Sequence, residues 1–400
     1  MENTEKITAP QNTLPAMKTA SGWMSFLFTL TRQEDLSTSI NIDEEIWLSL
    51  HHISEVQELG YELIKRKCTL TDSALHSKWE EFRGYIRQAE NFYRGALPLD
   101  YKSSPLNYYY SFLNLVKAYL LLNDNLLHKG LDQKKIIRHG LSPTRNYSTK
   151  QIFLNNSVDV AGGNEVFSKF YKAIFDRDLQ DGFKFLISEL VGYVYEISWQ
   201  VQRSGSNYKL KSFHGHRALL FDRNRTEAWE FFDIDGRILK VWDFRKETIF
   251  KSVYKQVDPN KGFMREMFDM DAEQVNRGIF FESIHNIKID SITTYHDLNL
   301  NFKKALYDSV SPVLVPMGYS YDLCAPYSTS PFVSMNQELA IYITMYFLSD
   351  LVRYNPHVID WISETKDSWI LESFVKSAPL MFLRAMNSRL IGSDILLRRL

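Results

Sequence analysis

The sequence predicts an α+β protein: a mainly α-helical bundle formed from the N- and C-terminal regions, with a β-rich middle segment. Three observations support this prediction. Apolar residues recur at helical spacing in the first half of the chain and again from residue 336. Between 210 and 320, short runs of β-branched and aromatic residues alternate with turn residues. Hydrophobic residues make up 44% of the 400 residues, which is enough material for a core.

The same patterns divide the chain into four parts. Residues 1–20 mix Pro, Thr, Asn and Lys without periodicity, so we expect a disordered tail. Residues 21–205 are expected to form an N-terminal helical region and 206–320 a β-rich insertion. Residues 321–400 are expected to form a C-terminal helical region that completes the bundle.

Helices are expected in the N-terminal region at 43–67, 78–96, 105–122, 164–175 and 181–203. Pro98 closes the second of these, and Pro105 opens the third at its first turn, where the missing N–H costs nothing. That third helix is apolar nearly all round, so we place it at the centre of the bundle. Lys117 is its only charge, and it either reaches the surface along its stem or pairs with a carboxylate.

Strands are expected at Ala218–Phe221, Ala228–Ile234, Ile238–Trp242, Gly278–Ile284 and Val313–Val315. The dipeptide Asp235-Gly236 predicts a two-residue hairpin turn, because both residues tolerate positive φ. The helical pattern returns at Asn336–Arg353, 356–365, 368–377 and a last helix near 380–390.

Charge and cysteine content limit the class of protein. The formal net charge is −1, which argues against broad electrostatic capture of nucleic acid. The two cysteines, Cys68 and Cys324, are too few for a disulfide framework or a cysteine-based zinc site. No secretory signal is recognised, and the apolar stretches Leu106–Leu122 and Leu339–Val352 are interpreted as buried helices. We therefore expect a cytoplasmic protein with no membrane partner.

The best candidate site is the turn at residues 353–357. Asn355 is suited to cap the helix that follows, and the next residue, a proline, suits its first turn. His357 then lies where the helix dipole favours a neutral imidazole, which can act as a base. Arg353 stays charged and can hold a phosphate or stabilise developing negative charge. The structural alternative is that Arg353 pairs with Asp350 and His357 only makes a hydrogen bond at the corner.

Two further clusters have weaker signals. In a polar loop, Gly140 permits a tight turn beside Arg138 and His139, so the loop could bind a phosphate; a solvated run of charges is the alternative. His214 and His216 would share one face of a strand, as metal ligands can.

The nearest candidates for a third metal ligand are Asp222, Asp233 and Asp235, and none follows at a recognisable spacing. We favour the alternative that these histidines lie in solvent where the strand begins, so no metal is expected. No cofactor motif occurs either: the phosphate loop, the dinucleotide fingerprint and the nucleophile elbow are all missing from the sequence.

Two stretches resemble a known family. Residues 104–118, SPLNYYYSFLNLVKA, look like the central helix of the YaaC-like bacterial proteins. Residues 346–357, YFLSDLVRYNPH, look like that family's C-terminal helix and its Arg-Tyr-x-Pro turn, and the loop 138–141 fits the same family. The resemblance extends in order over about 80–390.

A wider likeness is to HEPN-type helical bundles, which often carry a similar Tyr-Tyr…Lys-Ala helix. Nuclease members of that group pair an Arg with a His, usually act as dimers and cut RNA without metal. Arg353 and His357 resemble that pair, but three residues lie between them instead of four to six. The resemblance implies His357 as base and Arg353 as the group that stabilises the transition state, with Tyr354 or Asn355 orienting the phosphate.

The leading hypothesis is therefore an RNA-processing or RNA-binding protein of stress or antiphage defence, dimeric, with metal-independent ribonuclease activity if it is an enzyme. One alternative is a non-enzymatic interaction or assembly module that binds a protein partner or copies of itself. Another is a nucleotide- or phosphate-binding sensor that uses Arg138, His139 and Arg353. The sequence leaves open whether the protein is an enzyme.

Overall fold

The structure is a computed structural model that describes residues 17–18, 22–26, 32–35, 41–65, 70–123, 138–144, 153–154, 156–161, 165–179, 181–203, 210–222, 226–235, 251–257, 278–289, 313–317, 320–326, 335–391 and 393–396. Within the strands at 17–35, 210–222, 232–235, 278–279, 313–326 and 393–396, only the backbone is described. The chain divides into two compact units. The sheet unit comprises Met1–Gln33 and Leu210–Ser334, and the helical unit comprises Glu34–Lys209 and Met335–Leu400. The predicted class, α+β and mainly helical, is confirmed.

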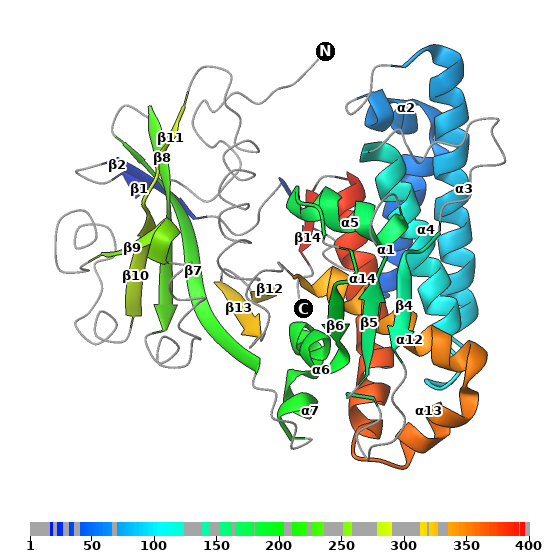
Figure 1. The fold of residues 1–400 in the computed structure, drawn as a ribbon. Coiled ribbons are helices and arrows are strands. Elements are labelled where there is room, and N and C mark those ends of the chain that lie inside the picture. The colour runs from blue at the N-terminus through cyan, green and yellow to red at the C-terminus, as the bar shows by residue number, and fades with distance from the viewer. Residues whose placement is uncertain are drawn as a thin grey trace. The chain divides into compact units, whose positions relative to one another are not determined.

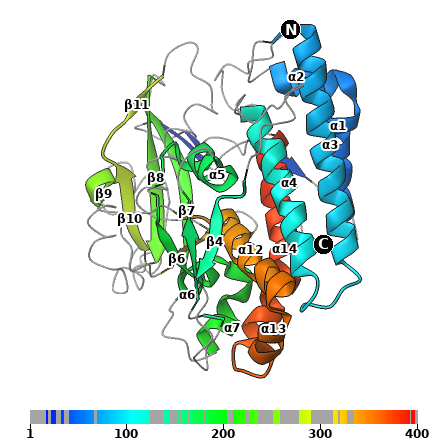
Figure 2. The same ribbon diagram turned by 45° about the vertical axis from the view of Figure 1, so that its right-hand side comes forward.

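The helical unit is built from helices at both ends of the chain; in Figures 1 and 2, α1–α4 are blue to cyan, α5–α7 are green and α12–α14 are orange to red. Its N-terminal helices are α1 (Ile42–Glu55), α2 (Gln57–Lys65), α3 (Asp72–Ala96), α4 (Pro105–Asn123), α5 (Val166–Phe175), α6 (Ile187–Leu190) and α7 (Ser198–Arg203). Its C-terminal helices are α12 (Gln337–Tyr354), α13 (Pro356–Ser363) and α14 (Ser368–Ile391). Two 3-10 turns, η2 (Val191–Tyr193) and η3 (Tyr195–Ile197), lie between α6 and α7.

Helix α4 lies at the centre of this unit, as its all-round apolar character predicts. It packs against α3, α12 and α14, and Figure 2 shows α3 and α4 running side by side. Phe112 of α4 stacks on Phe382 of α14 with 4.0 Å between ring centres. Every residue of α12 from Leu339 to Leu351 is buried. Lys117 is half-buried, with its Nζ 5.7 Å from the centre of the Tyr85 ring.

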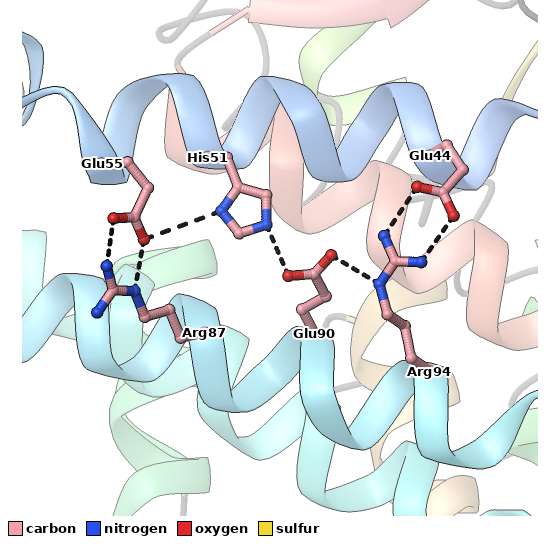
Figure 3. A network of polar contacts seen from close by, with 6 residues as sticks. All are labelled: Glu44, His51, Glu55, Arg87, Glu90 and Arg94. Carbon is pink, nitrogen blue, oxygen red and sulfur yellow. Dashed lines mark hydrogen bonds and ion pairs between the residues drawn. The ribbon is translucent and has the colours of Figure 1, made fainter.

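A chain of polar and charged residues joins α1 to α3 at the surface. Figure 3 shows it: Glu44, His51, Glu55, Arg87, Glu90 and Arg94. Arg94 bonds both oxygens of Glu44 at 2.7 and 2.8 Å, and Glu90 lies 2.6 Å from His51 Nε2. The hydrogen bond from Arg87 lowers the pKa of the Glu55 carboxyl. Because every member has a partner within the chain, we interpret the network as a structural clamp between the two helices.

Three of the expected helices differ from the structure. The segment 43–67 breaks at Val56, between α1 and α2. The pattern at 181–203 does not give one helix, because Lys184–Leu186 form strand β6 and pair with β5 (Ser157–Val160). The helices expected at 368–377 and near 380–390 are one continuous helix that runs through Pro379. In the last two cases tertiary contacts override the local preference.

The small sheet of the helical unit has the order β4-β5-β6, in which β4 (Leu141–Thr144) and β5 are antiparallel. Strand β3 (Arg32–Asp35) pairs with β14 (Ser393–Leu396). The helices examined in the described ranges include none with the length and apolar character that a membrane span requires.

The sheet unit is an antiparallel sheet arranged around one long strand, β7 (Leu210–Asp222). One edge of β7 pairs with β2 (Gly22–Phe26) and β13 (Ser320–Pro326), and the other with β8 (Glu227–Asp235). The remaining strands are β1 (Met17–Lys18), β9 (Tyr254–Val257), β10 (Gly278–Ser283), β11 (Ile287–Lys288) and β12 (Val313–Met317).

Four expected strands coincide with β7, β8, β10 and β12, whereas 238–242 and Gly236 lie outside the described residues. Met17–Lys18, expected in a disordered tail, instead pair with β2, because their backbone groups extend the sheet edge. Strand β13 crosses the boundary expected at residue 320, since pairing with β7 continues the sheet into that segment.

Candidate functional site

The turn between α12 and α13 has the predicted backbone. Asn355 donates its backbone N–H to the Leu351 carbonyl at 2.8 Å, and its own carbonyl accepts from Val358 N–H at 2.9 Å. It occupies the N-cap position of α13, but its side chain makes no capping hydrogen bond. The Asn355 amide nitrogen Nδ2 is buried and has no partner among the described residues. The predicted side-chain cap is therefore not formed, and the hydrogen bonds that Asn355 makes at the turn come from its backbone.

His357 is exposed on the first turn of α13. Its ring meets Trp361 edge-on, with 4.8 Å between ring centres. In the described part of the chain no hydrogen bond or ion pair joins His357 to Arg353. The two residues predicted as a catalytic pair therefore lie at the same corner without contact.

Arg353 makes different contacts from those expected. Its Nη1 donates to the Tyr110 hydroxyl of α4 at 3.2 Å. Its guanidinium carbon lies 5.0 Å from the ring centre of Tyr354, which is 57% exposed. No ion pair between Arg353 and Asp350 is found among the described residues, so the structural alternative for Arg353 is not supported. The Arg353 guanidinium is exposed and contacts two tyrosines, so some of its N–H donors still face solvent.

The loop 138–140 caps helix α5. The carbonyls of Arg138 and His139 accept from the first N–H groups of that helix, at 3.0 and 3.1 Å. Gly140 has φ +78°, and a Cβ at this position would lie 2.5 Å from the Cβ of Glu165. The first two N–H groups of α5 are therefore occupied by the loop itself and are not open to an anion.

These backbone contacts place the imidazole of His139. Its Nδ1 accepts from the Leu141 N–H at 3.2 Å, which indicates a neutral ring with its proton on Nε2. The ring packs against Tyr346 of α12 with 5.0 Å between centres. Tyr346 in turn donates its hydroxyl to the Leu141 carbonyl at 2.7 Å. One hydrogen bond and one ring contact thus join helix α12 to the loop.

Burial and nearby charges both act on the pKa of His139. Burial lowers this pKa, the negative charges of Glu165 and Asp350 raise it, and Arg353 lowers it. Arg353 and Asp350 therefore act on the same imidazole, although more than two hundred residues separate them from it in sequence. Asp350 is 7% exposed.

We define the Arg353 surface by the residues that these contacts join: Tyr110, His139, Tyr346, Asp350 and Arg353. Two of them, Arg353 and His139, are among the residues predicted from sequence. Arg138 is exposed at the edge of the same loop, and Tyr354 lies under the guanidinium.

Sequence reasoning missed Tyr110 as part of this surface. The only available signal was the run of three tyrosines, 108–110, in an otherwise apolar helix. Such a run indicates packing as much as binding. Only the hydrogen bond with Arg353 distinguishes Tyr110 from the two tyrosines before it.

The chemistry of the surface suits an oxyanion. Arg353 offers a permanent positive charge with several N–H donors, and His139 offers its Nε2–H. Among the residues whose side chains are described, no group of three or more His, Cys, Asp or Glu could hold a metal ion.

Comparison with known proteins gave one match. A family model described as YaaC-like Protein matches residues 49–390. No curated protein matches the chain, and no solved structure does.

Proposed function

The chain belongs to the YaaC-like protein family, and we propose that it binds RNA through phosphates held at the Arg353 surface. The observation that carries this proposal is that three segments meet there: Tyr110 of α4 contacts the Arg353 guanidinium of α12, and His139 of the loop 138–140 packs on Tyr346 of the same helix α12. Convergence of polar residues from distant segments is difficult to explain by packing alone.

Arg353 would hold a phosphate oxygen through the N–H groups that Tyr110 leaves free. His139 would donate a second hydrogen bond from Nε2, because its Nδ1 is occupied by the Leu141 N–H. In this tautomer His139 is a donor and cannot accept a proton on Nε2. Its role is therefore binding, and the position of Asp350 on the same surface keeps the net charge there low.

The exposed ring of Tyr354 supports RNA as the ligand. Unpaired bases stack on tyrosine rings and on guanidinium planes, and Tyr354 carries Arg353 on its ring. A single strand can place a phosphate on Arg353 and a base beside it, whereas a duplex keeps its bases stacked inside.

Metal-independent cleavage is the second proposal. The specific observation in its favour is that His357 and Arg353 are both exposed at the α12–α13 corner. On the resemblance to HEPN-type bundles, we propose that the active form is a dimer acting in the cytoplasm in stress or antiphage defence. In that form His357 would be the base and Arg353 would stabilise charge on the phosphorane-like transition state.

The test measures binding of a short labelled single-stranded RNA at low salt by fluorescence anisotropy. Losing a charge-assisted phosphate contact costs about 1.5–3 kcal/mol, so Arg353→Gln should weaken binding by about tenfold or more. It should also reduce the salt dependence by about one phosphate contact. Arg83→Gln is the matched control, because Arg83 also lies over an aromatic ring, 4.5 Å from the centre of Trp79, and should leave binding unchanged.

Three outcomes separate the hypotheses. Equal losses for the two arginine variants, or no RNA binding at all, would contradict the proposal. Equal affinity for a mononucleotide and for RNA would favour the sensor alternative. RNA that is cut by the wild-type protein but not by His357→Ala would support cleavage, and intact RNA with tight binding would limit the function to binding.

A further inference from the structure

The outer side of the helix pair α3 and α4 carries a row of half-buried aromatic and cationic side chains. Figure 2 shows the two helices side by side, and α4 is buried from Tyr108 to Leu122 except at Tyr110, Leu113 and Lys117. These three positions follow one another at a spacing of three and four residues, so they share one face of the helix. The central helix of the bundle therefore reaches the surface along one narrow row.

Helix α3 contributes a matching row. The ring of Phe92 stacks on that of Tyr110 with 5.2 Å between centres, and both residues are half-buried. The amine of Lys117 lies 5.7 Å from the ring centre of Tyr85, which is also half-buried. The second contact is seven residues from the first on each helix, which is two helical turns on one face. We define the α3–α4 surface by five residues: Tyr85, Phe92, Tyr110, Leu113 and Lys117.

Packing of α3 on α4 does not account for the exposed part of this row. On the buried side the two helices already have a ring contact, between Tyr93 and Tyr108, with 5.4 Å between centres. Those two rings are 2% and 8% exposed. The pair of Phe92 and Tyr110 leaves more of its aromatic area in water, where a ligand that covers it would gain free energy.

The α3–α4 surface is continuous with the Arg353 surface, because Tyr110 belongs to both. Its hydroxyl accepts from Arg353 Nη1 at 3.2 Å, while its ring faces the α3 phenylalanine. The amine of Lys117 over Tyr85 also repeats the contact of Arg353 over Tyr354, at 5.7 and 5.0 Å from the ring centres. Two cations held on tyrosines thus lie on either side of one stacked aromatic pair.

On the basis of the proposed RNA binding, we propose that the bound strand continues from Arg353 along the α3–α4 surface. One base would stack on the rings of Phe92 and Tyr110, and Lys117 would hold a second phosphate. Along a single strand each base lies between two phosphates, which matches an aromatic pair between two cations. Two helical turns rise about 10 Å, so Lys117 is a separate phosphate contact from the one at Arg353.

The charge of Lys117 fits this role. It is the only charged residue of α4, and its amine lies at the half-buried end of the row. Glu81 accepts the Tyr85 hydroxyl at 3.1 Å, which holds that ring beside Lys117. A lysine over a fixed aromatic ring presents its charge at a defined place.

The test measures binding of the labelled single-stranded RNA to the full-length protein by fluorescence anisotropy. Lys117→Gln removes the charge and should weaken binding by about tenfold and reduce the salt dependence by about one phosphate contact. Lys376→Gln is the matched control, because Lys376 is exposed on α14 and pairs with Glu372 at 2.5 Å. The same change in net charge there should leave binding unchanged.

Phe92→Leu tests the stacking of a base. It removes the ring but keeps an apolar side chain, and it should weaken binding by about fivefold or more. Phe183→Leu is the matched control, because Phe183 is also half-buried and packs on another ring, that of Phe185, with 4.8 Å between centres. Far-UV circular dichroism checks that each variant is folded.

Photo-crosslinking locates the strand on the wild-type protein and needs no variant. RNA that carries 4-thiouridine is irradiated in the complex, and the crosslinked peptides are identified by mass spectrometry. We expect crosslinks in the peptides of α3 and α4 that contain Phe92 and Tyr110, in addition to crosslinks at Tyr354.

The outcomes separate this inference from the proposed function. If Arg353→Gln weakens binding but folded Lys117→Gln and Phe92→Leu do not, the strand does not follow α3 and α4, and RNA binding at the Arg353 surface still stands. Crosslinks at Tyr354 without any in α3 or α4 would overturn the inference in the same way. A wild-type protein that binds no RNA would overturn both.

Discussion

Three glycine-to-alanine substitutions separate a steric cost from a conformational one. Gly140 has φ +78° and Gly182 has φ +72°, so an alanine at either site must adopt the left-handed conformation, which costs about 1–2 kcal/mol. At Gly182 nothing lies within 4 Å of the new Cβ, and this cost is the whole effect. At Gly140 the new Cβ would lie 2.5 Å from the Cβ of Glu165, closer than real Cβ contacts.

Neither side of the Gly140 contact moves freely. Glu165 precedes α5 directly, and the carbonyls of Arg138 and His139 bond the first turn of that helix. Relief of the clash must displace the loop or the helix, and overpacking of this kind costs about 1–3 kcal/mol. We therefore expect a total loss of about 2–5 kcal/mol for Gly140→Ala and about 1–2 kcal/mol for Gly182→Ala.

Gly84 provides the control of opposite sign. It lies inside α3 with nothing within 4 Å of its Cβ position, so Gly84→Ala should stabilise the protein by about 1 kcal/mol. Urea unfolding followed by far-UV circular dichroism, which mainly reports the helices, measures all three variants. Equal losses for Gly140→Ala and Gly182→Ala would refute the reasoning, because the contact with Glu165 would then have no cost.

Three further predictions concern one buried hydroxyl and two side chains with shifted pKa values. Thr344→Val should raise the free energy of unfolding by about 1 kcal/mol, because the Thr344 hydroxyl is buried without a hydrogen-bond partner among the described residues; a less stable variant in urea would contradict this. Burial raises the pKa of the Glu196 carboxyl in the folded protein. The contribution of Glu196 to folding stability is therefore complete below the ordinary carboxyl pKa, and it is lost as pH rises through the raised pKa of the folded state. Glu196→Gln should therefore be more stable than wild type near pH 7 and lose that advantage in acid, and a melting-temperature difference that does not change with pH would disprove it. Burial lowers the pKa of His139, so its contribution is complete above the ordinary histidine pKa of 6.5 and is lost as pH falls through the lowered value. His139→Asn should flatten the decline in melting temperature below pH 6.5, and a decline as steep as that of the wild type would rule out His139 as its source.

Helices with a strong local pattern were predictable. Pro105 starts α4, and Asn336 caps α12 with its side-chain oxygen accepting the Leu339 N–H at 3.0 Å. Such signals act within one turn of the chain, so the sequence carries them in full. The prediction failed where a distant strand competed, at Lys184–Leu186, and where burial carried a helix through Pro379.

The candidate site was predictable only as separate pieces. Arg353 and His139 have residue types that suit phosphate binding, and both were identified from sequence. From the sequence, Arg353 was paired with His357 because that histidine lies only four residues further along the chain. Its contact with Tyr110 and the effect of its charge on His139 depend on how α4, α12 and the loop 138–140 pack.

The sequence by itself determined most of the helices and strands and which residues can carry charge or donate hydrogen bonds, because periodicity and side-chain chemistry are local. Tertiary structure decided which of these residues meet. The hydrophobic effect is not directional, so the apolar residues of a segment do not show in the sequence which other segment they will pack against. Strand register is equally hidden, since a shift of one residue would move every side chain to the opposite face. Only the folded sheet places Asp233 opposite His216, and only the folded bundle places Tyr110 against Arg353.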